Sequence, residues 1–588
     1  MVLFGNKIIK LENKGRIFGA LDISKPNEQY REKILEQGEL ALKYEPRLVP
    51  ASYYMEFFKS GSRTTYESPT HERRDMLARL TYAALYGDKE RYIPKMIDII
   101  WAICEETSWV IPPHSISKGY VLGAKPLPDQ FGDDILEVDL FSATTGATLS
   151  LAYFFFEKEL SEATHGVITE RIRYEIRRRI IKPFLMNEMR WEYSFVNNWL
   201  PWIISNVLTC AAVIVDETLP TMQTIVSRSA FYLDRFVGTY GDDCGCNEGA
   251  SYWNAAGAAL FDACELLYDI TGGAVDGLHT DFMKKTCRFI ADMCICPDTR
   301  LFVNFADCGP YVRSISGNML RRMGKTLGDG VLETLGEKFA RDLDTELNFH
   351  SVAFFGYRYA KSLFYSDFGK GEPIPEGSVV YLDLEIALLR AGSAVAVLKG
   401  GHNRESHNHN DVGTFLLYFK NEPVIIDSGN LEYTRDTFNE NRYKIWTNQS
   451  SYHNLPDIDG VMQEAGAKFR SDRFECRGNT AEVSYGGAYP INAKITRKIE
   501  LDEKSLTVSD CAEGGEATYH FMCRVKPQIS GNTAIIGRVK ASFSENGGIS
   551  VDKVDVSSSP GMKKSWDTDA LYRINVKANT LKTVFTEV

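Results

Sequence analysis

The hydrophobic pattern of the sequence changes its period once, in the Gly- and Pro-rich segment FGKGEPIPEG at residues 368–377. Before this segment, apolar residues recur at the i, i+3, i+4, i+7 spacing of helices, in stretches such as LTYAALYGDKERYIPKMIDIIWAICEE and NNWLPWIISNVLTCAAVIV. After it, short runs alternate apolar and polar residues, such as TFLLYFK, AKITRKIEL and YRINVKA, with Gly, Asn and Asp turns between them. The sequence therefore predicts a helical part followed by a β part.

These two parts predict a multidomain α+β protein. Residues 1–370 contain roughly a dozen amphipathic stretches joined by short breaks, without a close internal repeat, which fits an α/α toroid, an incomplete barrel of paired helices. Residues 378–588 have the strand and turn spacing of an antiparallel β-sandwich. The composition is that of an ordinary globular protein, with 44% hydrophobic and 25% charged residues, which excludes a disordered chain.

Charge and cysteine content restrict the partners and the compartment. The net charge is −11 and no basic block stands out, so we do not expect nucleic acid as a partner. No apolar run is long enough to cross a membrane, and the N-terminus lacks the apolar core of a signal peptide. The 12 cysteines are spread over the chain in contexts such as FDACELL, which is typical of buried free thiols. We therefore expect a cytoplasmic protein without a membrane partner, and a homodimer is compatible with the sequence.

Histidines are scarce, ten in 588 residues, yet His402, His407 and His409 all fall within GGHNRESHNHNDVGTF. On a strand, His407 and His409 would share one face. Asp427 ends the apolar pattern PVIID, where an unpaired carboxylate would be costly, and His453 follows in SSYHNLPD. Imidazole and carboxylate groups suit Zn²⁺, so His409, Asp427 and His453 are candidate ligands of a three-ligand zinc site. A hydrogen-bonded cluster without metal is the alternative, and spacing alone leaves the role of His407 open.

Two stretches of the helical part also combine unusual residue types. WEYSFVNNWLPW, at residues 191–202, surrounds Asn197 and Asn198 with aromatic residues. It fits either a sugar-binding wall with amide donors or a helix N-cap with core aromatics behind it. In YGDDCGCNEGASYWNAAG, at residues 240–257, a Gly-rich acidic loop leads into Tyr252, which lies either at the rim of the toroid or in its core.

Together these motifs resemble those of the heparinase II/III-type polysaccharide lyases over nearly the whole chain. The strongest likeness is an ordered series: SHNHNDVG at 406–413, IIDSG at 425–429, RY at 442–443, SSYHN around His453, and DGVMQ at 459–463. NNW at 197–199 and EGASYW at 248–253 match the helical part. The sequence departs from the family at Trp199, where several members have a histidine.

The resemblance implies a role for each matching residue. Tyr252, His407 and Asn198 resemble the catalytic residues, with Asn198 as the amide that binds the substrate carboxylate. His409, Asp427 and His453 resemble the ligands of one structural Zn²⁺ per chain. Candidate substrate-binding residues are Asn197, Trp199, Glu248, Arg63, Arg313 and Tyr443; for Arg63 and Arg313, an ordinary solvated arginine is the alternative.

The family reaction is β-elimination at a uronic acid, which leaves an unsaturated uronic acid end. It requires neutralisation of the substrate carboxylate before the C5 proton can be removed. Tyr252 would remove that proton, donate one to the leaving oxygen, or do both in a syn elimination, and His407 is the alternative base in an anti geometry. The implied partner is an anionic oligo- or polysaccharide, either a glycosaminoglycan such as heparan, chondroitin or hyaluronan, or alginate, in saccharide catabolism of the bacterial type.

Two other functions are compatible with the sequence. A glycoside hydrolase on an α/α toroid would need two carboxylates across its site, and Glu192, Asp242, Asp243 and Glu248 are available. A non-catalytic carbohydrate-binding relative is the second. The hydrolase leaves the SHNHND series unexplained, and only a lyase makes a conjugated C4–C5 double bond.

Overall fold

The computed structural model describes residues 2–5, 10–11, 14–115, 127–128, 137–186, 189, 191, 196–215, 219–545 and 548–588, without the side chains of Arg435 and Phe438. The chain divides into two compact units. The first comprises Met1–Tyr240, Asn254–Cys287 and Ser314–Pro373, and the second comprises Gly241–Trp253, Arg288–Arg313 and Ile374–Val588. Two segments that precede residue 370 in the sequence therefore belong to the second unit.

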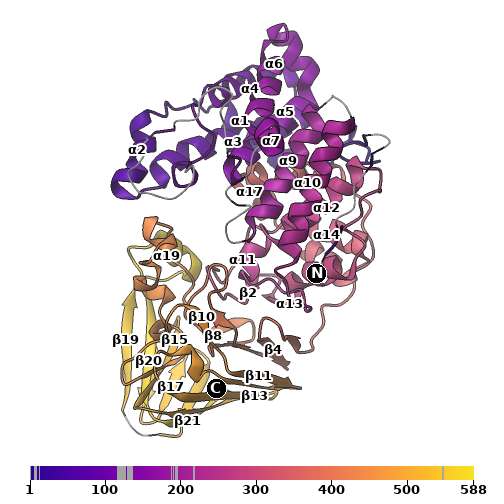
Figure 1. The fold of residues 1–588 in the computed structure, drawn as a ribbon. Coiled ribbons are helices and arrows are strands. Elements are labelled where there is room, and N and C mark those ends of the chain that lie inside the picture. Colours follow the sequence, from indigo (N-terminus) through magenta and orange to yellow (C-terminus); the bar gives the residue numbers. More distant parts are fainter. Residues whose placement is uncertain are drawn as a thin grey trace. The chain divides into compact units, whose positions relative to one another are not determined.

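The first unit is built from helices, drawn in indigo to pink in Figure 1. Its α-helices are α1 (Arg31–Leu42), α2 (Ala51–Ser60), α3 (Thr64–Tyr86), α4 (Lys89–Cys104), α5 (Leu140–Thr164), α6 (Val167–Ile176), α7 (Lys182–Met186), α9 (Trp199–Ile214), α10 (Leu219–Val237), α12 (Gly257–Ile270), α14 (Gly317–Leu327), α15 (Gly330–Ala340), α16 (Leu343–Glu346), α17 (Phe349–Phe354) and α18 (Gly356–Phe364). Helix α13 (Asp281–Asp292) begins in the first unit and ends in the second.

Polar caps define where several of these helices begin. Asp139 and Ser142 form a reciprocal capping box at the start of α5, and Ser316 caps α14. Helices α5 and α9 are apolar over most of their surface, are buried along most of their length and pack against each other. A helix that is apolar all round has to lie inside a protein, so these two form the core of the unit.

The second unit contains the strands, drawn mainly in brown to yellow in Figure 1. They are β1 (Cys294–Cys296), β2 (Leu301–Phe302), β3 (Val379–Tyr381), β4 (Ile386–Ala391), β5 (Ala394–Lys399), β6 (His402–Asn403), β7 (Phe415–Phe419), β8 (Glu422–Ile425), β9 (Pro456–Ile458), β10 (Gly466–Arg470), β11 (Arg473–Arg477), β12 (Thr480–Ser484), β13 (Lys494–Leu501), β14 (Ser505–Glu513), β15 (Ala517–Cys523), β16 (Gln528–Ser530), β17 (Thr533–Ile536), β18 (Val539–Phe543), β19 (Ile549–Asp555), β20 (Ala570–Lys577) and β21 (Thr580–Glu587). Two short helices, α11 (Gly249–Trp253) and α19 (Pro560–Trp566), belong to the same unit.

Three antiparallel sheets make up most of this unit. Their strand orders are β3-β4-β5-β7-β8, β11-β12-β13-β14-β21-β18-β17-β16 and β19-β20-β15-β9. Side chains along β13 and β14 alternate between buried and more exposed, because successive residues of a strand point to opposite faces. The inward residues of all three sheets join in one apolar cluster, which includes Phe415, Phe521 and Phe585. The predicted order, a helical part and then antiparallel sheets, is confirmed.

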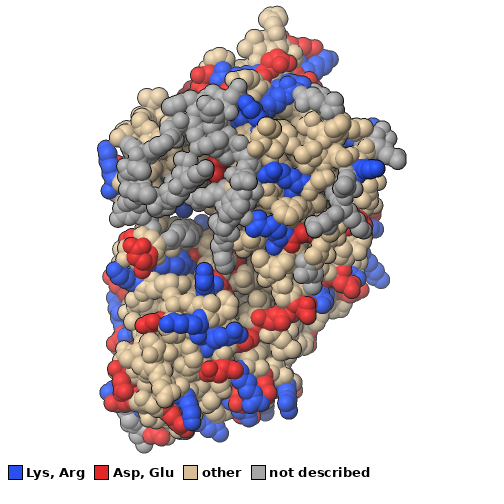
Figure 2. Space-filling model, viewed as in Figure 1, with Lys and Arg blue, Asp and Glu red and all other residues tan. Residues whose placement is uncertain are grey.

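Surface and thiol chemistry agree with an ordinary globular protein. Basic and acidic side chains are interspersed on the face shown in Figure 2. All 12 cysteines are free thiols, ten of them buried. Within the described part of the chain, no helix is both long and apolar enough to span a bilayer.

Candidate functional site

After the short strand β6, the histidine-rich segment forms a loop that leads to β7, so His407 and His409 are not on a strand. The expectation that His407 and His409 share a strand face is therefore wrong, and His407 instead takes a positive φ of 56°. Such a conformation is uncommon for a residue other than glycine and is found at functional sites. The buried Lys399, at the end of β5, anchors the loop through ion pairs with Asp411 (2.5 Å) and Glu405 (3.1 Å).

One buried carboxylate, that of Asp307, lies at the centre of this loop. Its Oδ2 accepts hydrogen bonds from His407 Nδ1 at 2.9 Å and from the Tyr433 hydroxyl at 2.9 Å. Its Oδ1 is 3.0 Å from His409 Nε2 and 3.0 Å from Arg442 Nη2. Burial raises the pKa of Asp307, but these hydrogen bonds and the Arg442 charge more than offset it and hold the pKa well below its ordinary value.

Arg442, in the short 3₁₀ helix Arg442–Lys444, also fixes the backbone of the loop. Its Nε and Nη2 donate to the carbonyl oxygen of Asn408, at 3.1 and 2.9 Å. Asn408 lies between the two histidines, so this fork sets the direction in which each ring leaves the backbone.

Tyr252 lies against this cluster from helix α11. Its ring stacks on the ring of His407, with centroids 3.7 Å apart and an interplanar angle of 20°. Its hydroxyl is 2.6 Å from the hydroxyl of Tyr433. Burial raises the pKa of Tyr252 above its ordinary value, whereas the hydrogen bond with Tyr433 lowers it. The buried Glu248 approaches His407 from the other side, with its Oε2 3.6 Å from Nε2.

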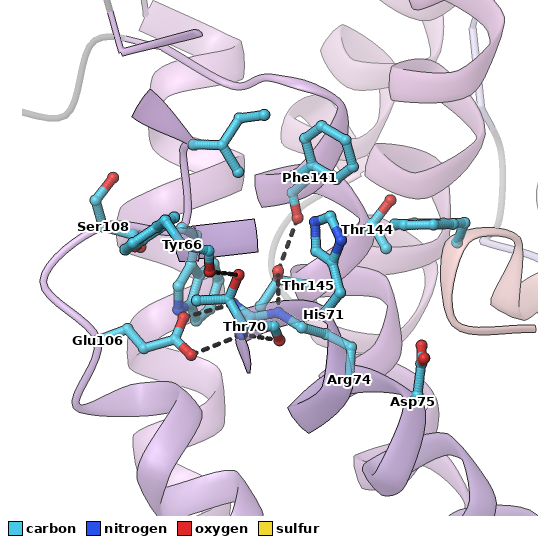
Figure 3. Close-up of a pocket in the computed structure, with 13 residues that line it drawn as sticks. Tyr66, Thr70, His71, Arg74, Asp75, Glu106, Ser108, Phe141, Thr144 and Thr145 are labelled. Carbon is cyan, nitrogen blue, oxygen red and sulfur yellow. Dashed lines mark hydrogen bonds and ion pairs between the residues drawn. The ribbon is translucent and has the colours of Figure 1, made fainter. Parts of the chain in front are cut away.

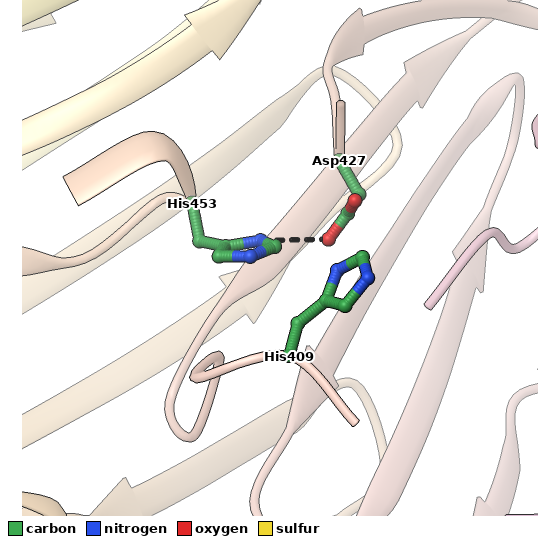
Figure 4. Close-up of side chains that lie close together, drawn as sticks. All are labelled: His409, Asp427 and His453. Carbon is green, nitrogen blue, oxygen red and sulfur yellow. Dashed lines mark hydrogen bonds and ion pairs between the residues drawn. The ribbon is translucent and has the colours of Figure 1, made fainter. Parts of the chain in front are cut away.

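The three predicted metal ligands meet next to this cluster. His409, Asp427 and His453 are 1%, 0% and 0% exposed, and one possible ligand atom of each lies within 4.8 Å of the others. Figure 4 shows the three side chains pointing toward one another, with His453 Nδ1 2.8 Å from Asp427 Oδ2. His409 Nδ1 and His453 Nε2 are buried and have no hydrogen-bond partner among the described residues. Two orphaned imidazole nitrogens beside a carboxylate fit a divalent cation such as Zn²⁺.

Asparagines hold the backbone that carries these ligands. The side chain of Asn454, next to His453, donates to the carbonyl oxygens of Phe415 and Ile426, at 2.7 and 3.0 Å. The side chain of Asn304 donates to the carbonyl oxygen of Asp427 at 3.0 Å. The positions of the ligands are therefore fixed by the strands around them.

Other predicted residues lie in the first unit. Asn198 is 3% exposed and precedes helix α9, and the side chain of Asn197 accepts a hydrogen bond from the amide of Trp199 at 3.1 Å. The ring of Trp199 lies 4.5 Å from that of His114, and Arg63 is close enough to lower the pKa of His114, after the larger effect of burial. Arg63, Trp199 and His114 are thus neighbours within this unit.

The remaining predicted residues differ in their surroundings. The hydroxyl of Tyr443 accepts a hydrogen bond from Asn408 at 3.3 Å, which places it beside the histidine loop. Arg313 is exposed and forms no hydrogen bond or ion pair with that loop in the described part of the chain. Asp243 accepts hydrogen bonds from the backbone amides of Asp383 and Leu384, and Glu192 lies outside the described residues.

Sequence reasoning missed Asp307, Tyr433 and Arg442 as site residues. Arg442 stands in the RY motif beside the predicted Tyr443, and that motif was a usable signal. Asp307 and Tyr433 stand in NFADCG and NLEYTRD, which match no motif singled out above.

The first unit also contains a small pocket lined by polar and aromatic side chains, shown in Figure 3. Arg74 and Glu106 in its wall form a two-bond ion pair, at 2.6 Å for each bond. His71 stacks on Phe141 at 4.8 Å, and its buried Nε2 has no hydrogen-bond partner in the described regions. The strongest charges of this pocket thus neutralise each other.

Comparisons with known proteins relate the chain to polysaccharide lyases. Residues 373–570 match the family described as Heparinase II/III-like, C-terminal. A solved heparinase III is similar with a TM-score of 0.62 and 13% identity, covering 100% of this chain and 88% of that one. A heparan sulfate lyase from Pedobacter heparinus has a TM-score of 0.56 and 14% identity, and the match covers 99% of this chain and 86% of that one. A xanthan lyase from Paenibacillus has a TM-score of 0.53 and 9% identity, and the match covers 97% of this chain and 58% of that one. A comparison with curated proteins found no match.

At these identities the likeness shows the fold. It confirms the predicted α/α toroid followed by an antiparallel β-sandwich, and residues 373–570 are similar to the Heparinase II/III-like, C-terminal family.

Proposed function

We propose that this protein is a polysaccharide lyase that cleaves uronic-acid-containing chains by β-elimination. One observation carries the proposal: the half-buried Tyr252 stacks on His407, and the buried Asp307 fixes that histidine. A phenol and an imidazole in contact provide two groups able to transfer protons, positioned by a third. The family match over residues 373–570 and the fold of the solved lyases support the same assignment.

In the proposed reaction the phenolate oxygen of Tyr252 removes the C5 proton of the uronate. The electron pair left at C5 forms the C4–C5 double bond as the bond from C4 to the glycosidic oxygen breaks. Tyr252 then gives its proton to the departing oxygen, so one residue serves as base and acid in a syn elimination. The products are a new chain end and an unsaturated uronic acid, and the enzyme returns to its starting state.

The substrate carboxylate must be neutralised before the C5 proton becomes acidic enough to transfer. We assign this role to the Asn198 amide and to the His407 ring. Because Asp307 is an ionised acceptor, His407 carries a hydrogen on Nδ1, and its Nε2 lies 3.6 Å from Glu248 Oε2. Asn197, Trp199, Arg63 and Tyr443 remain predicted substrate-binding residues, as do Glu248 and Arg313.

A structural Zn²⁺ held by His409, Asp427 and His453 is part of the proposal. A bound cation would satisfy the two orphaned imidazole nitrogens and stiffen the loop that presents His407. Asp307 supports the same arrangement, because its two oxygens hold His407 and His409 at the same time.

The proposed substrates are anionic oligosaccharides from glycosaminoglycans or alginate. The similar solved structures are named for different polymers, heparan sulfate and xanthan, so the fold is compatible with several substrates. A cytoplasmic location, where 12 free thiols stay reduced, is also proposed and would favour short chains over intact polymers.

A panel of defined uronic-acid oligosaccharides, followed by ultraviolet absorbance, tests the function. A lyase produces the absorbance of the conjugated double bond with each cleavage. New reducing ends without absorbance would identify a hydrolase, and binding without either signal would identify a non-catalytic carbohydrate-binding protein. Either result would overturn the proposal.

A further inference from the structure

The hydroxyl of Tyr433 lies where three groups of the candidate site meet. It is 2.6 Å from the Tyr252 hydroxyl, 2.9 Å from Asp307 Oδ2 and 3.4 Å from His407 Nδ1. No motif in the sequence singles Tyr433 out, and the reaction described above does not use it.

The available hydroxyl hydrogens determine which group donates each of these hydrogen bonds. Asp307 forms an ion pair with Arg442 at 3.0 Å, and a carboxylate can only accept, so Tyr433 donates its single hydroxyl hydrogen to Asp307. The hydrogen between the two phenols then belongs to Tyr252, which donates it to the Tyr433 oxygen. In this state Tyr252 is a neutral phenol.

The arrangement changes when Tyr252 loses that hydrogen. Its phenolate oxygen is then the nearest acceptor to Tyr433, at 2.6 Å compared with 2.9 Å for Asp307. A hydrogen bond to an anionic oxygen is roughly twice as strong as one to a neutral oxygen. Rotation about the C–O bond of Tyr433 is enough to redirect its hydrogen, and no covalent bond forms or breaks.

We infer that Tyr433 is a positioning residue for Tyr252: it directs its hydroxyl hydrogen to Asp307 while Tyr252 is a phenol and to Tyr252 once that residue is a phenolate. Tyr433 thereby stabilises the form of Tyr252 that accepts a proton. The inference rests on the proposed function only for its effect on catalysis, because the hydrogen-bond exchange itself needs no substrate.

The other charged groups around Tyr252 do not offer the same stabilisation. Asp307 and Glu248 are anionic and oppose a phenolate, and Arg442 favours it only through space. His407 contacts the face of the Tyr252 ring rather than its oxygen. Among the described residues of the site, the hydrogen bond at the Tyr252 oxygen comes from Tyr433.

The test is a ¹⁹F NMR titration of protein labelled with 3-fluorotyrosine, in which the Tyr252 signal is assigned by its loss in Tyr252→Phe. A hydrogen bond to a charged group contributes about 1.5–3 kcal/mol, so Tyr433→Phe should raise the pKa of residue 252 by about one to two units. Replacing Tyr433 with 4-aminophenylalanine restores an N–H donor at the same reach and should return the pKa toward the parental value. Tyr485→Phe, which removes a buried hydroxyl from the same unit, should leave it unchanged.

An unchanged pKa in Tyr433→Phe would overturn the inference. So would a raised pKa that 4-aminophenylalanine does not reverse, because the effect would then come from packing. If Tyr433→Phe does not fold, the 4-aminophenylalanine variant decides: a pKa near the parental value supports the inference, and a raised one overturns it. On a substrate that the parent cleaves, Tyr433→Phe should shift the rise of kcat/KM to higher pH by the same amount. An inactive parent would refute the proposed function without affecting the titration.

Discussion

The rings of Tyr252 and His407 stack face to face, with their centroids 3.7 Å apart. Removing either ring would let the other move, so an alanine at one position disturbs both candidate bases. The two residues can be distinguished only by substitutions that preserve the shape of each side chain.

We expect Tyr252→Phe to lower lyase turnover by about 10²- to 10⁴-fold, the usual contribution of a group that transfers protons. The substitution removes one oxygen and keeps the ring that stacks on His407, so KM should change little. Initial rates by ultraviolet absorbance measure the effect. Near-parental turnover would assign the proton transfer to His407 and exclude the syn mechanism.

His407→Asn should also lower turnover strongly while the protein keeps its metal content. Asparagine is chosen because it tolerates the positive φ of this position, which alanine does not. His402→Asn, in the same loop, is the matched control and should retain activity. If His407→Asn loses metal, His407 is itself a metal ligand, and its exclusion from the proposed ligand set is wrong.

Purified protein should contain about one equivalent of zinc by elemental analysis. His453→Ala should lose it and melt at a temperature several degrees lower, because metal binding is coupled to the folding of its site. Adding a chelator to the parent should reproduce the lower melting temperature. A metal-free preparation that is fully active and equally stable would show that the three side chains form a hydrogen-bonded cluster instead.

His71 should make the first unit sensitive to acid. Burial, followed by the nearby His350, Arg74 and Arg63, lowers the pKa of His71 from 6.5 to about 3. The unfolded chain therefore binds a proton that the folded chain does not, and stability is full above pH 6.5 and is lost as the pH falls toward 3.

In His71→Gln, the free energy of unfolding should fall less steeply as the pH is lowered. The slope should decrease by up to the contribution of one proton, about 1.4 kcal/mol per pH unit. Thermal unfolding followed by circular dichroism between pH 7 and pH 4 measures it. His279→Gln, at an exposed position, is the control. If the stability of His71→Gln and that of the parent fall in parallel as the pH is lowered, His71 is not held neutral in the folded protein.

The fold and the clustering of His409, Asp427 and His453 could be predicted because their signals are local. The change from a helical to an alternating period marks the two kinds of structure, and Asp427 follows strand β8 as the PVIID pattern indicates. The path of the histidine loop could not be predicted, because it depends on the positive φ of His407 and on the fork from Arg442. Asp307 was missed because its role comes from four donors that are distant in the sequence, which spacing does not reveal.

The second unit is assembled from three separate stretches of chain, and this affects the order of events during synthesis. Gly241–Trp253 and Arg288–Arg313, which carry Tyr252 and Asp307, leave the ribosome before Ile374–Val588, which carries His407 and Tyr433. Long-range pairings of this kind form slowly, because a large loop must close before its contacts form. The proposed catalytic site therefore cannot form until the last of these stretches has been synthesised. A protein shortened at its C-terminus would leave both early segments without their partners, as candidates for aggregation or chaperone capture.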